Sequence, residues 1–403
     1  MSYNLKKMNH ERQIVHIDLD SFFVSVECRS NSSLLNKPVA IGGSSERGVV
    51  ASCSYEARKY GVHSAMPGKL AKQLCPDLIF LSGDYESYTK ASQEVTQIIE
   101  EEVPVFEKTS IDEFYIDMTG MDRFYGTLKH ATELREKVIR ETGLPISFGL
   151  SKNKTVSKVA TGLAKPNGYK YVAYGEEKPF LAPLNVRKIP MIGEKAAQNL
   201  KRMGVEKVFT LQQMPVRLLE SAFGKQGTMM WEKANGIDLS PITPYTDRKS
   251  LSSEETFDKD TMDIEMLESL LVSMTEDLCF KMRKENFLSG CISVKIRYSD
   301  FNTYTQQIKI PYTSADHLLI PQVKALFKKL YNRRMLIRLI GVRLSQLVRG
   351  HHQIHLFNDS ENQIHLYQAM DYINSRYGNK AVHRAVTTGI SRKSFNPFNG
   401  IKA

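Results

Sequence analysis

The pattern of apolar and polar positions predicts alternating strands and helices over the first 175 residues. Residues 14–29 begin with an apolar run and predict a strand that leads directly into a helix. The same two patterns recur, with strands expected at 48–51, 114–117 and 146–150 and helices at 66–75, 85–102, 127–141 and 151–164. This mixture of elements indicates an α/β sandwich.

The pattern changes in the second half of the chain. Residues 179–234 are helical in pattern, with glycines at the expected turns, and the polar, proline-containing stretch 241–253 predicts an interdomain linker. After it we expect a helix, two strands, a helix and a strand, at 262–283, 292–298, around 308–310, 323–331 and 340–344. These elements predict a small α+β domain, which a polar tail follows from residue 350.

The helix expected at 151–164 ends in a lysine that lies off its buried stripe. The stripe follows helical spacing and consists of Val156, Val159, Ala160 and Leu163. Lys158, Thr161 and Lys165 lie outside it. Because Pro166 disfavours helical geometry at the preceding residue, we expect Lys165 at the helix end, free to reach out.

Composition places the chain among ordinary globular proteins of more than one domain. Its 403 residues exceed what one hydrophobic core usually holds, and 41% are hydrophobic and 25% charged. It contains no apolar run long enough for a membrane span, and its start lacks an apolar signal-peptide core. Five scattered cysteines without a C-x-x-C pair argue against disulfides and zinc. We expect a cytoplasmic monomer.

Positive charge is concentrated in one segment. Residues 281–350 hold 14 Lys and Arg but 3 Asp and Glu, so their surplus accounts for the whole net charge of +11. A basic surplus confined to one segment predicts a surface for a polyanion, and nucleic acid is the partner it favours.

Two carboxylate clusters lie about ninety residues apart. Asp18 and Asp20 follow the first apolar run, and Asp112 and Glu113 open the strand expected at 114–117. Adjacent strand residues point to opposite faces, so the second pair can share a site only at a strand end or turn. Converging carboxylates suit Mg²⁺, which takes oxygen ligands. Solvated turn caps are the alternative for any one of these acids, and the two clusters together favour a site.

A second group of residues predicts a triphosphate contact. Ser52, Tyr55 and Arg58 place a hydroxyl, a phenol and a guanidinium close together. With Lys165 they can neutralise a triphosphate, Arg58 through bidentate hydrogen bonds and Lys165 as a point charge. By itself a Tyr-x-x-Arg pair is more often a solvated helix face.

Residues 184–203 resemble a helix-hairpin-helix. Such a hairpin offers backbone N–H groups to a phosphate without reading sequence. Met191 stands where a glycine is usual. A plain helix pair is the alternative.

Several motifs in fixed order resemble those of the Y-family DNA polymerases, in the DNA polymerase IV (DinB-like) branch, with the UmuC-like branch as a near neighbour. They are Asp18-x-Asp20-x-Phe22-Phe23, residues 55–62, Ser110-Ile111-Asp112-Glu113, and Ser151-Lys152-Asn153-Lys154 followed by residues 164–168. The resemblance covers about residues 12–350. It implies an α+β multidomain fold with a palm, fingers and thumb polymerase core and a small α+β little-finger domain.

The resemblance also implies domain boundaries. They are palm at 1–29 and 85–175, fingers at 30–84, thumb with the hairpin at 176–244, linker at 245–250, little finger at 251–349 and a tail at 350–403.

Carried over by position, the resemblance gives the acids a catalytic role. Asp18, Asp112 and Glu113 match catalytic metal ligands, with the backbone carbonyl of Leu19 as a further oxygen, and two Mg²⁺ ions are implied. Asp20 is not a metal ligand in this resemblance, and we rank it below the other acids.

The remaining carried-over residues contact the nucleotide. Tyr55, Arg58 and Lys165 match triphosphate contacts, and Ser52 stands at a neighbouring position. Phe23 matches the steric gate, the aromatic side chain that lies against the sugar and rejects a ribose 2′-OH, whereas we expect Phe22 in the core.

The tail contains a short candidate docking motif. Gln353, Leu356 and Phe357 fit the Gln-x-x-Leu-Phe pattern by which bacterial polymerases engage the β sliding clamp. Such motifs usually lie near the end of a chain, yet 46 residues follow here. A short amphipathic strand is the alternative.

Together these patterns predict a template-directed DNA polymerase of low fidelity. It extends primers on primer–template DNA past damaged bases, by two-metal-ion nucleotidyl transfer from dNTPs. The alternative is a catalytically weak or UmuC-like DNA- and clamp-binding repair factor, against which the intact acids count. A palm-type nucleotide cyclase leaves the basic domain unexplained.

Overall fold

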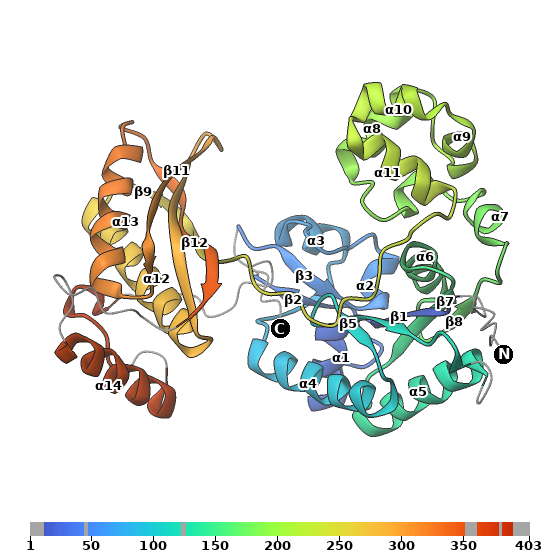
Figure 1. Ribbon diagram of the computed structural model, residues 1–403, viewed down its shortest axis with the longest axis horizontal. Helices are drawn as coiled ribbons and strands as arrows, with labels where there is room; N and C mark the ends of the chain where they lie inside the picture. The colour runs from blue at the N-terminus through green and yellow to red at the C-terminus, as the bar shows by residue number, and fades with distance from the viewer. Residues whose placement is uncertain (1–11, 44–46, 122–125, 351–360, 379–380, 390–403) are drawn as a thin grey trace, which may run out of the picture. The chain divides into compact units, whose positions relative to one another are not determined.

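The computed structural model describes residues 12–43, 47–121, 126–350, 361–378 and 381–389 (Figure 1). The chain divides into two units, Met1–Thr246 and Asp247–Gly400. Within the described residues no helix is long and apolar enough to cross a membrane.

A five-stranded sheet forms the centre of the first unit. Its strand order is β5-β6-β1-β7-β8, with β1 (Ile14–Leu19) antiparallel to both β6 (Glu113–Asp117) and β7 (Ile146–Ser151). The edge strands are β5 (Phe106–Lys108) and β8 (Tyr169–Tyr171). Five of the six residues of β1 are buried, as its apolar run predicts. The strands expected at 14–17, 114–117 and 146–150 are thereby confirmed.

Helices cover both faces of this sheet (Figure 1). Helix α6 (Lys154–Ala164) packs on one face, and α4 (Tyr85–Glu102) and α5 (Thr127–Thr142) lie on the other. The approach of α6 requires Gly149 on β7, where an added Cβ would lie 2.2 Å from the Ser157 carbonyl oxygen. The predicted α6 stripe is buried except for Leu163, which is exposed because it lies in the last turn.

Two smaller parts complete the first unit. A three-stranded sheet of order β3-β2-β4 is accompanied by short helices; the elements are α1 (Phe22–Ser30), β2 (Val39–Gly42), β3 (Val50–Cys53), α2 (Tyr55–Lys59), α3 (Gly68–Leu74) and β4 (Ile79–Leu81). The other part is helical, as its pattern predicts, with α7 (Glu177–Leu181), α8 (Glu194–Arg202), α9 (Val208–Gln213), α10 (Val216–Phe223) and α11 (Lys225–Ala234).

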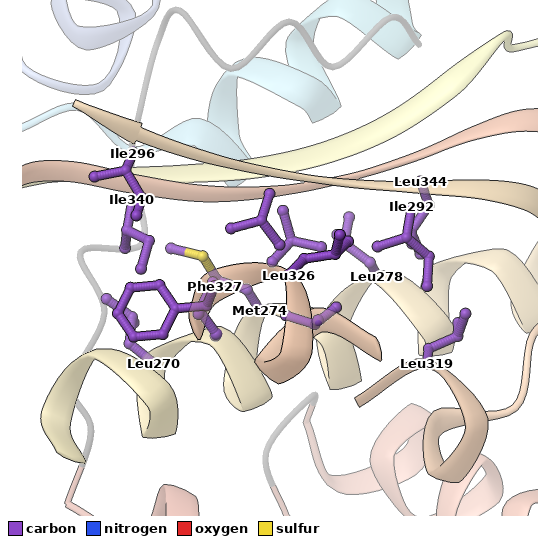
Figure 2. Packing of buried hydrophobic residues seen from close by; sticks show 14 of the residues in the cluster. Leu270, Met274, Leu278, Ile292, Ile296, Leu319, Leu326, Phe327, Ile340 and Leu344 are labelled. Atoms are coloured by element: carbon purple, nitrogen blue, oxygen red, sulfur yellow. The ribbon is translucent and has the colours of Figure 1, made fainter. Parts of the chain in front are cut away.

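The second unit is a four-stranded antiparallel sheet with helices packed on one face. Its strand order is β11-β10-β12-β9. The elements are β9 (Ser250–Thr261), α12 (Ile264–Lys284), β10 (Phe287–Tyr298), β11 (Thr303–Thr313), α13 (Asp316–Leu330) and β12 (Ile337–Arg349). Figure 2 shows its core, in which Leu270, Met274 and Leu278 of α12 and Leu319, Leu326 and Phe327 of α13 meet Ile292, Ile296, Ile340 and Leu344 of the sheet.

Strand β9 was not expected from the sequence. From Ser250 onward the predicted linker is part of this strand, which pairs with β12 along its length. It is an edge strand with mostly polar side chains, so alternation of apolar residues is absent. Backbone pairing with β12, together with burial of Leu251 and partial burial of Phe257, accounts for its formation.

Part of the predicted polar tail is ordered structure on the second unit. Helix α14 (Glu361–Tyr377) is bound to α12 by Asp371, which accepts two hydrogen bonds from Arg283 at 2.7 and 2.8 Å. Arg384 further along pairs with Glu276 of α12 at 2.7 Å. Gln353, Leu356 and Phe357, the predicted clamp-binding residues, lie outside the described residues.

Candidate active site

The register of the central strands brings the two acidic clusters together. Asp18 at the end of β1 lies directly opposite Glu113, the first residue of β6. The Leu19 N–H donates to the carbonyl oxygen of Asp112 at 3.0 Å, just before β6 begins. The pair therefore stands at a strand end, as the alternation argument requires.

One side of helix α6 lies over these acids. Lys158 donates to Glu113 at 2.6 Å, Thr161 Oγ1 lies 2.9 Å from His16 Nδ1, and the Lys165 ammonium hydrogen-bonds Asp18. The spacing of three and four residues places these α6 side chains on one helix face. Lys165 stands at the helix end as predicted but is not free, because it is ion-paired with Asp18.

Burial and like charge disfavour ionisation at two of the acids. Burial raises the pKa of Asp18 to about 7, against the opposing effect of Lys165 and with a further contribution from Asp112. Burial likewise raises the pKa of Asp112, although Ser110 donates to its carboxylate at 2.6 Å. A cation placed between these carboxylates would relieve both effects.

The pKa of Glu113 is shifted in the opposite direction. Burial acts to raise the pKa of Glu113, but His16 and Lys158 together hold it below its usual range. His16 Nε2 lies 4.0 Å away, and burial lowers the pKa of this imidazole. Lys158, whose ammonium lies 2.6 Å from Glu113, is the cation that is ion-paired with this acid.

The donor set fits a hard divalent cation, although the acids are not preassembled around one. In the ranges that the structure describes, no three acidic, histidine or cysteine side chains form a ready metal cluster. The ammonium of Lys165 lies against Asp18. A metal ion held by Asp18, Asp112 and the Leu19 carbonyl requires that this lysine move away, which is the movement that a triphosphate contact also requires.

Of the predicted triphosphate residues, Tyr55 and Arg58 lie on α2. The Arg58 guanidinium carbon lies 4.7 Å from the centre of the Tyr55 ring, and Arg58 Nε donates to the Cys53 carbonyl at 3.3 Å. Ser52 is half-buried on β3. Tyr55 donates its single phenolic proton to Asp20 at 3.1 Å, so a phosphate oxygen can take this proton only by replacing Asp20 as the acceptor.

Asp20, which is not a metal ligand in the resemblance, lies beside two of the predicted triphosphate contacts. Besides Tyr55, its carboxylate accepts from Ser147 Oγ and from the Asn167 N–H, each at 2.7 Å. Lys165 Nζ is 3.9 Å away. The two-residue spacing from Asp18 at a strand end was the available signal, because it places both acids on one face.

The two neighbouring phenylalanines differ in environment. Phe22 is buried in the core, as predicted. Phe23 is half-buried, and its ring stacks on Tyr88 with centroids 4.4 Å apart and an interplanar angle of 15°. Tyr88 is itself held by a 2.5 Å hydrogen bond to Glu27, so the Phe23 ring has a fixed support.

Comparison with known proteins decides the family. Residues 17–162 match the impB/mucB/samB family, 248–356 its C-terminal domain, and 187–238 the thumb domain of DNA polymerase iota. DNA polymerase IV of Dehalococcoides mccartyi strain CBDB1 is 35% identical over 380 residues, 93% of this chain and 97% of that protein. The chain belongs to the DNA polymerase IV branch of the Y-family. DNA polymerase IV 2 of Methanosarcina mazei is 37% identical over 350 residues, 85% of this chain and 95% of that protein.

The fold of a Y-family polymerase is independently evident. A solved Y-family DNA polymerase chimera superposes with a TM-score of 0.77 at 24% identity, over 84% of this chain and all of the other. This likeness confirms the expected α+β polymerase fold. The DNA polymerase IV relatives confirm the DNA-directed DNA polymerase activity, with binding of DNA and nucleotides implied. Polymerases of this family are generally metal-dependent. The UmuC-like alternative is not favoured.

The hairpin of this polymerase keeps the backbone shape that glycine usually supplies. Met191 has φ +74°, in the left-handed region, and its side chain is exposed. This conformation costs a non-glycine residue about 1 kcal/mol. The loop geometry therefore persists without the glycine.

Proposed function

We propose that this polymerase extends primers past damaged template bases by nucleotidyl transfer with two Mg²⁺ ions. The convergence of Asp18, Asp112 and Glu113 at one strand end is the observation that carries the proposal. We assign palm, fingers, thumb and little finger to the boundaries given above, and infer a cytoplasmic monomer that acts on primer–template DNA and dNTPs.

In this mechanism the protein supplies binding and orientation. Asp18, Asp112, Glu113 and the Leu19 carbonyl would hold the two ions. When bound, the ions lower the pKa of the primer 3′-OH and neutralise the departing pyrophosphate. Lys165 leaves Asp18 for the triphosphate, where Arg58 adds bidentate contacts. This exchange of partners keeps each charge compensated.

The proposed activity is tested by primer extension. The purified chain is given dNTPs and Mg²⁺ on an undamaged template and on one with a single abasic site. We expect extension on both, with products that pass the abasic position and with frequent mispairs. Extension that stops before the lesion would contradict the bypass role, and no extension on either template would contradict the polymerase assignment.

Phe23→Ala should weaken sugar discrimination. Removing the ring opens space at the position of a ribose 2′-OH, and relief of a steric clash of this size corresponds to roughly tenfold or more. The measurement is the ratio of kcat/KM for a dNTP to that for the matching rNTP. Phe22→Leu, which alters the adjacent core position, is the control and should leave this ratio unchanged. An unaltered ratio in Phe23→Ala would remove the gate assignment.

The tail motif should couple synthesis to a sliding clamp. We expect alanine at Gln353, Leu356 and Phe357 to leave distributive synthesis intact and to abolish stimulation by a loaded β clamp. Alanine at Ile354 and His355, which the motif does not specify, is the matched control and should retain stimulation. Equal stimulation of both variants would refute clamp binding through this motif.

A further inference from the structure

We infer that Asp20 is a positioning residue, which holds the turn after Lys165 and the ring of Tyr55 next to each other before a triphosphate binds. The inference rests on the proposed nucleotide site and goes beyond it, because Asp20 is neither a metal ligand nor a triphosphate contact in that proposal. Its carboxylate joins three segments that are separated by 35, 127 and 147 residues from it.

The carboxylate is fully enclosed and well supplied with donors. Asp20 is 1% exposed, so its oxygens have little access to water. Oδ2 accepts from Ser147 Oγ and the Asn167 N–H, and Oδ1 accepts from the Tyr55 phenol. A buried carboxylate is tolerated only when it is hydrogen-bonded in this way, so its position is tightly determined.

The bond to the Asn167 backbone holds the turn that follows α6. Lys165 is the C-cap of α6 and lies two residues before Asn167, whose N–H donates to Asp20. Arg135 donates to the Asn167 carbonyl at 2.7 Å, and the Gly168 N–H donates to Ser147 at 3.2 Å. The turn is therefore fixed from several sides, and the Asp20 carboxylate is the charged group that accepts its Asn167 N–H.

The hydrogen bond from Tyr55 connects Asp20 to helix α2, beside the three-stranded sheet. Tyr55 opens α2, and its ring lies beneath the Arg58 guanidinium. Because one carboxylate accepts from both Tyr55 and the turn after Lys165, it sets the distance between two proposed triphosphate contacts. A nucleotide then meets a turn and a ring that are already in place, and only the Lys165 ammonium and the Tyr55 phenolic proton change partners, which lowers the entropy lost on binding.

The test is the isosteric change Asp20→Asn in the full chain. An amide has one acceptor oxygen and cannot accept from all three donors, so the turn and Tyr55 lose a shared anchor. We expect the dNTP KM to rise roughly tenfold or more, since hydrogen bonds to charged groups carry that magnitude, while kcat falls less. Hydrogen exchange at the Asn167 amide should accelerate, which reports on the turn without any catalysis.

Asp238→Asn provides the matched control. Asp238 is another buried carboxylate that accepts from a backbone N–H and a hydroxyl, both of Thr155, at 3.1 and 2.7 Å. This variant should lose thermal stability to a similar extent, yet keep its dNTP KM within about twofold and its Asn167 exchange unchanged. Equal shifts in KM for both variants would reduce Asp20 to a purely structural residue.

A double-mutant cycle with Tyr55→Phe completes the test. If Asp20 acts partly through Tyr55, the effect of Asp20→Asn on KM is smaller in the Tyr55→Phe background than in the wild type. If the two substitutions change the dNTP KM by factors that simply multiply, the coupling between Asp20 and Tyr55 is refuted. An error in the proposed nucleotide site would give a different result. In that case Lys165→Ala and Arg58→Ala would also have the dNTP KM of the wild type.

Discussion

Asp112→Ala should reduce the kcat of primer extension on the order of a thousandfold or more, with primer–template binding retained. Asp112 is a half-buried acid whose backbone carbonyl accepts from Leu19 and whose carboxylate is oriented by Ser110. Removing it takes away a metal ligand, and metal stabilisation of the transition state amounts to several kcal/mol, each 1.4 kcal/mol being about tenfold in rate. Single-turnover extension and a DNA-binding titration measure the two quantities.

Asp117→Ala is the matched control for this experiment. Asp117 is an acid on the same strand β6, but it pairs with Ile14 at the end away from Asp18. Its carboxylate accepts a local hydrogen bond from the Thr119 N–H. We expect kcat within about twofold of the wild type. Full dNTP incorporation by Asp112→Ala would contradict the proposed mechanism.

Arg283→Ala should destabilise the second unit by about 3–5 kcal/mol and release helix α14. Arg283 pairs with Asp316 at 2.5 Å and with Asp371 at 2.7 Å, and Asp316 is almost completely buried. Burial acts to lower the pKa of Arg283, but Asp371 and Asp316 raise it above its usual range. The loss is large because, among the described residues, removal of the arginine leaves the buried Asp316 carboxylate with Arg384, at 3.2 Å, as its remaining cationic partner.

The measurement must resolve the second unit from the first. The single tryptophan of the chain, Trp231, lies in the first unit, so its fluorescence does not follow this transition. Hydrogen exchange in α12 and α14, measured at increasing urea concentration, reports the unfolding of the second unit. Lys328→Ala, which removes an exposed ion pair with Glu268 at 3.8 Å, is the control and should cause no measurable change. Unchanged protection of α14 in Arg283→Ala would contradict the proposed role of this network.

Much of the candidate site follows from local pattern. The apolar run before Asp18 predicts β1, and the acids at 112 and 113 can meet it only at a strand end, which is where the structure places them. The proline after Lys165 correctly ends α6 there. These inferences succeed because strand alternation and helix termination depend on residues close together in the sequence.

Other features depend on contacts between distant segments. The polar edge strand β9 forms through backbone pairing with β12, which leaves no apolar pattern to recognise. The tail after residue 360 packs on the second unit through charges on α12 that lie about ninety residues earlier. Lys165 has an acidic partner, Asp18, which lies 147 residues before it.

Asp20 shows most clearly which features follow from the sequence and which depend on the tertiary structure. Its sequence neighbourhood predicts an acid at a strand end, and the family resemblance leaves it without a role. Its three hydrogen bonds join β7, the turn after α6 and the start of α2, none of which is near it in the chain. Residue type and spacing thus identified the chemistry of this polymerase. The supporting network emerged only from the folded chain, because burial of a carboxylate selects whichever distant donors the packing brings within reach.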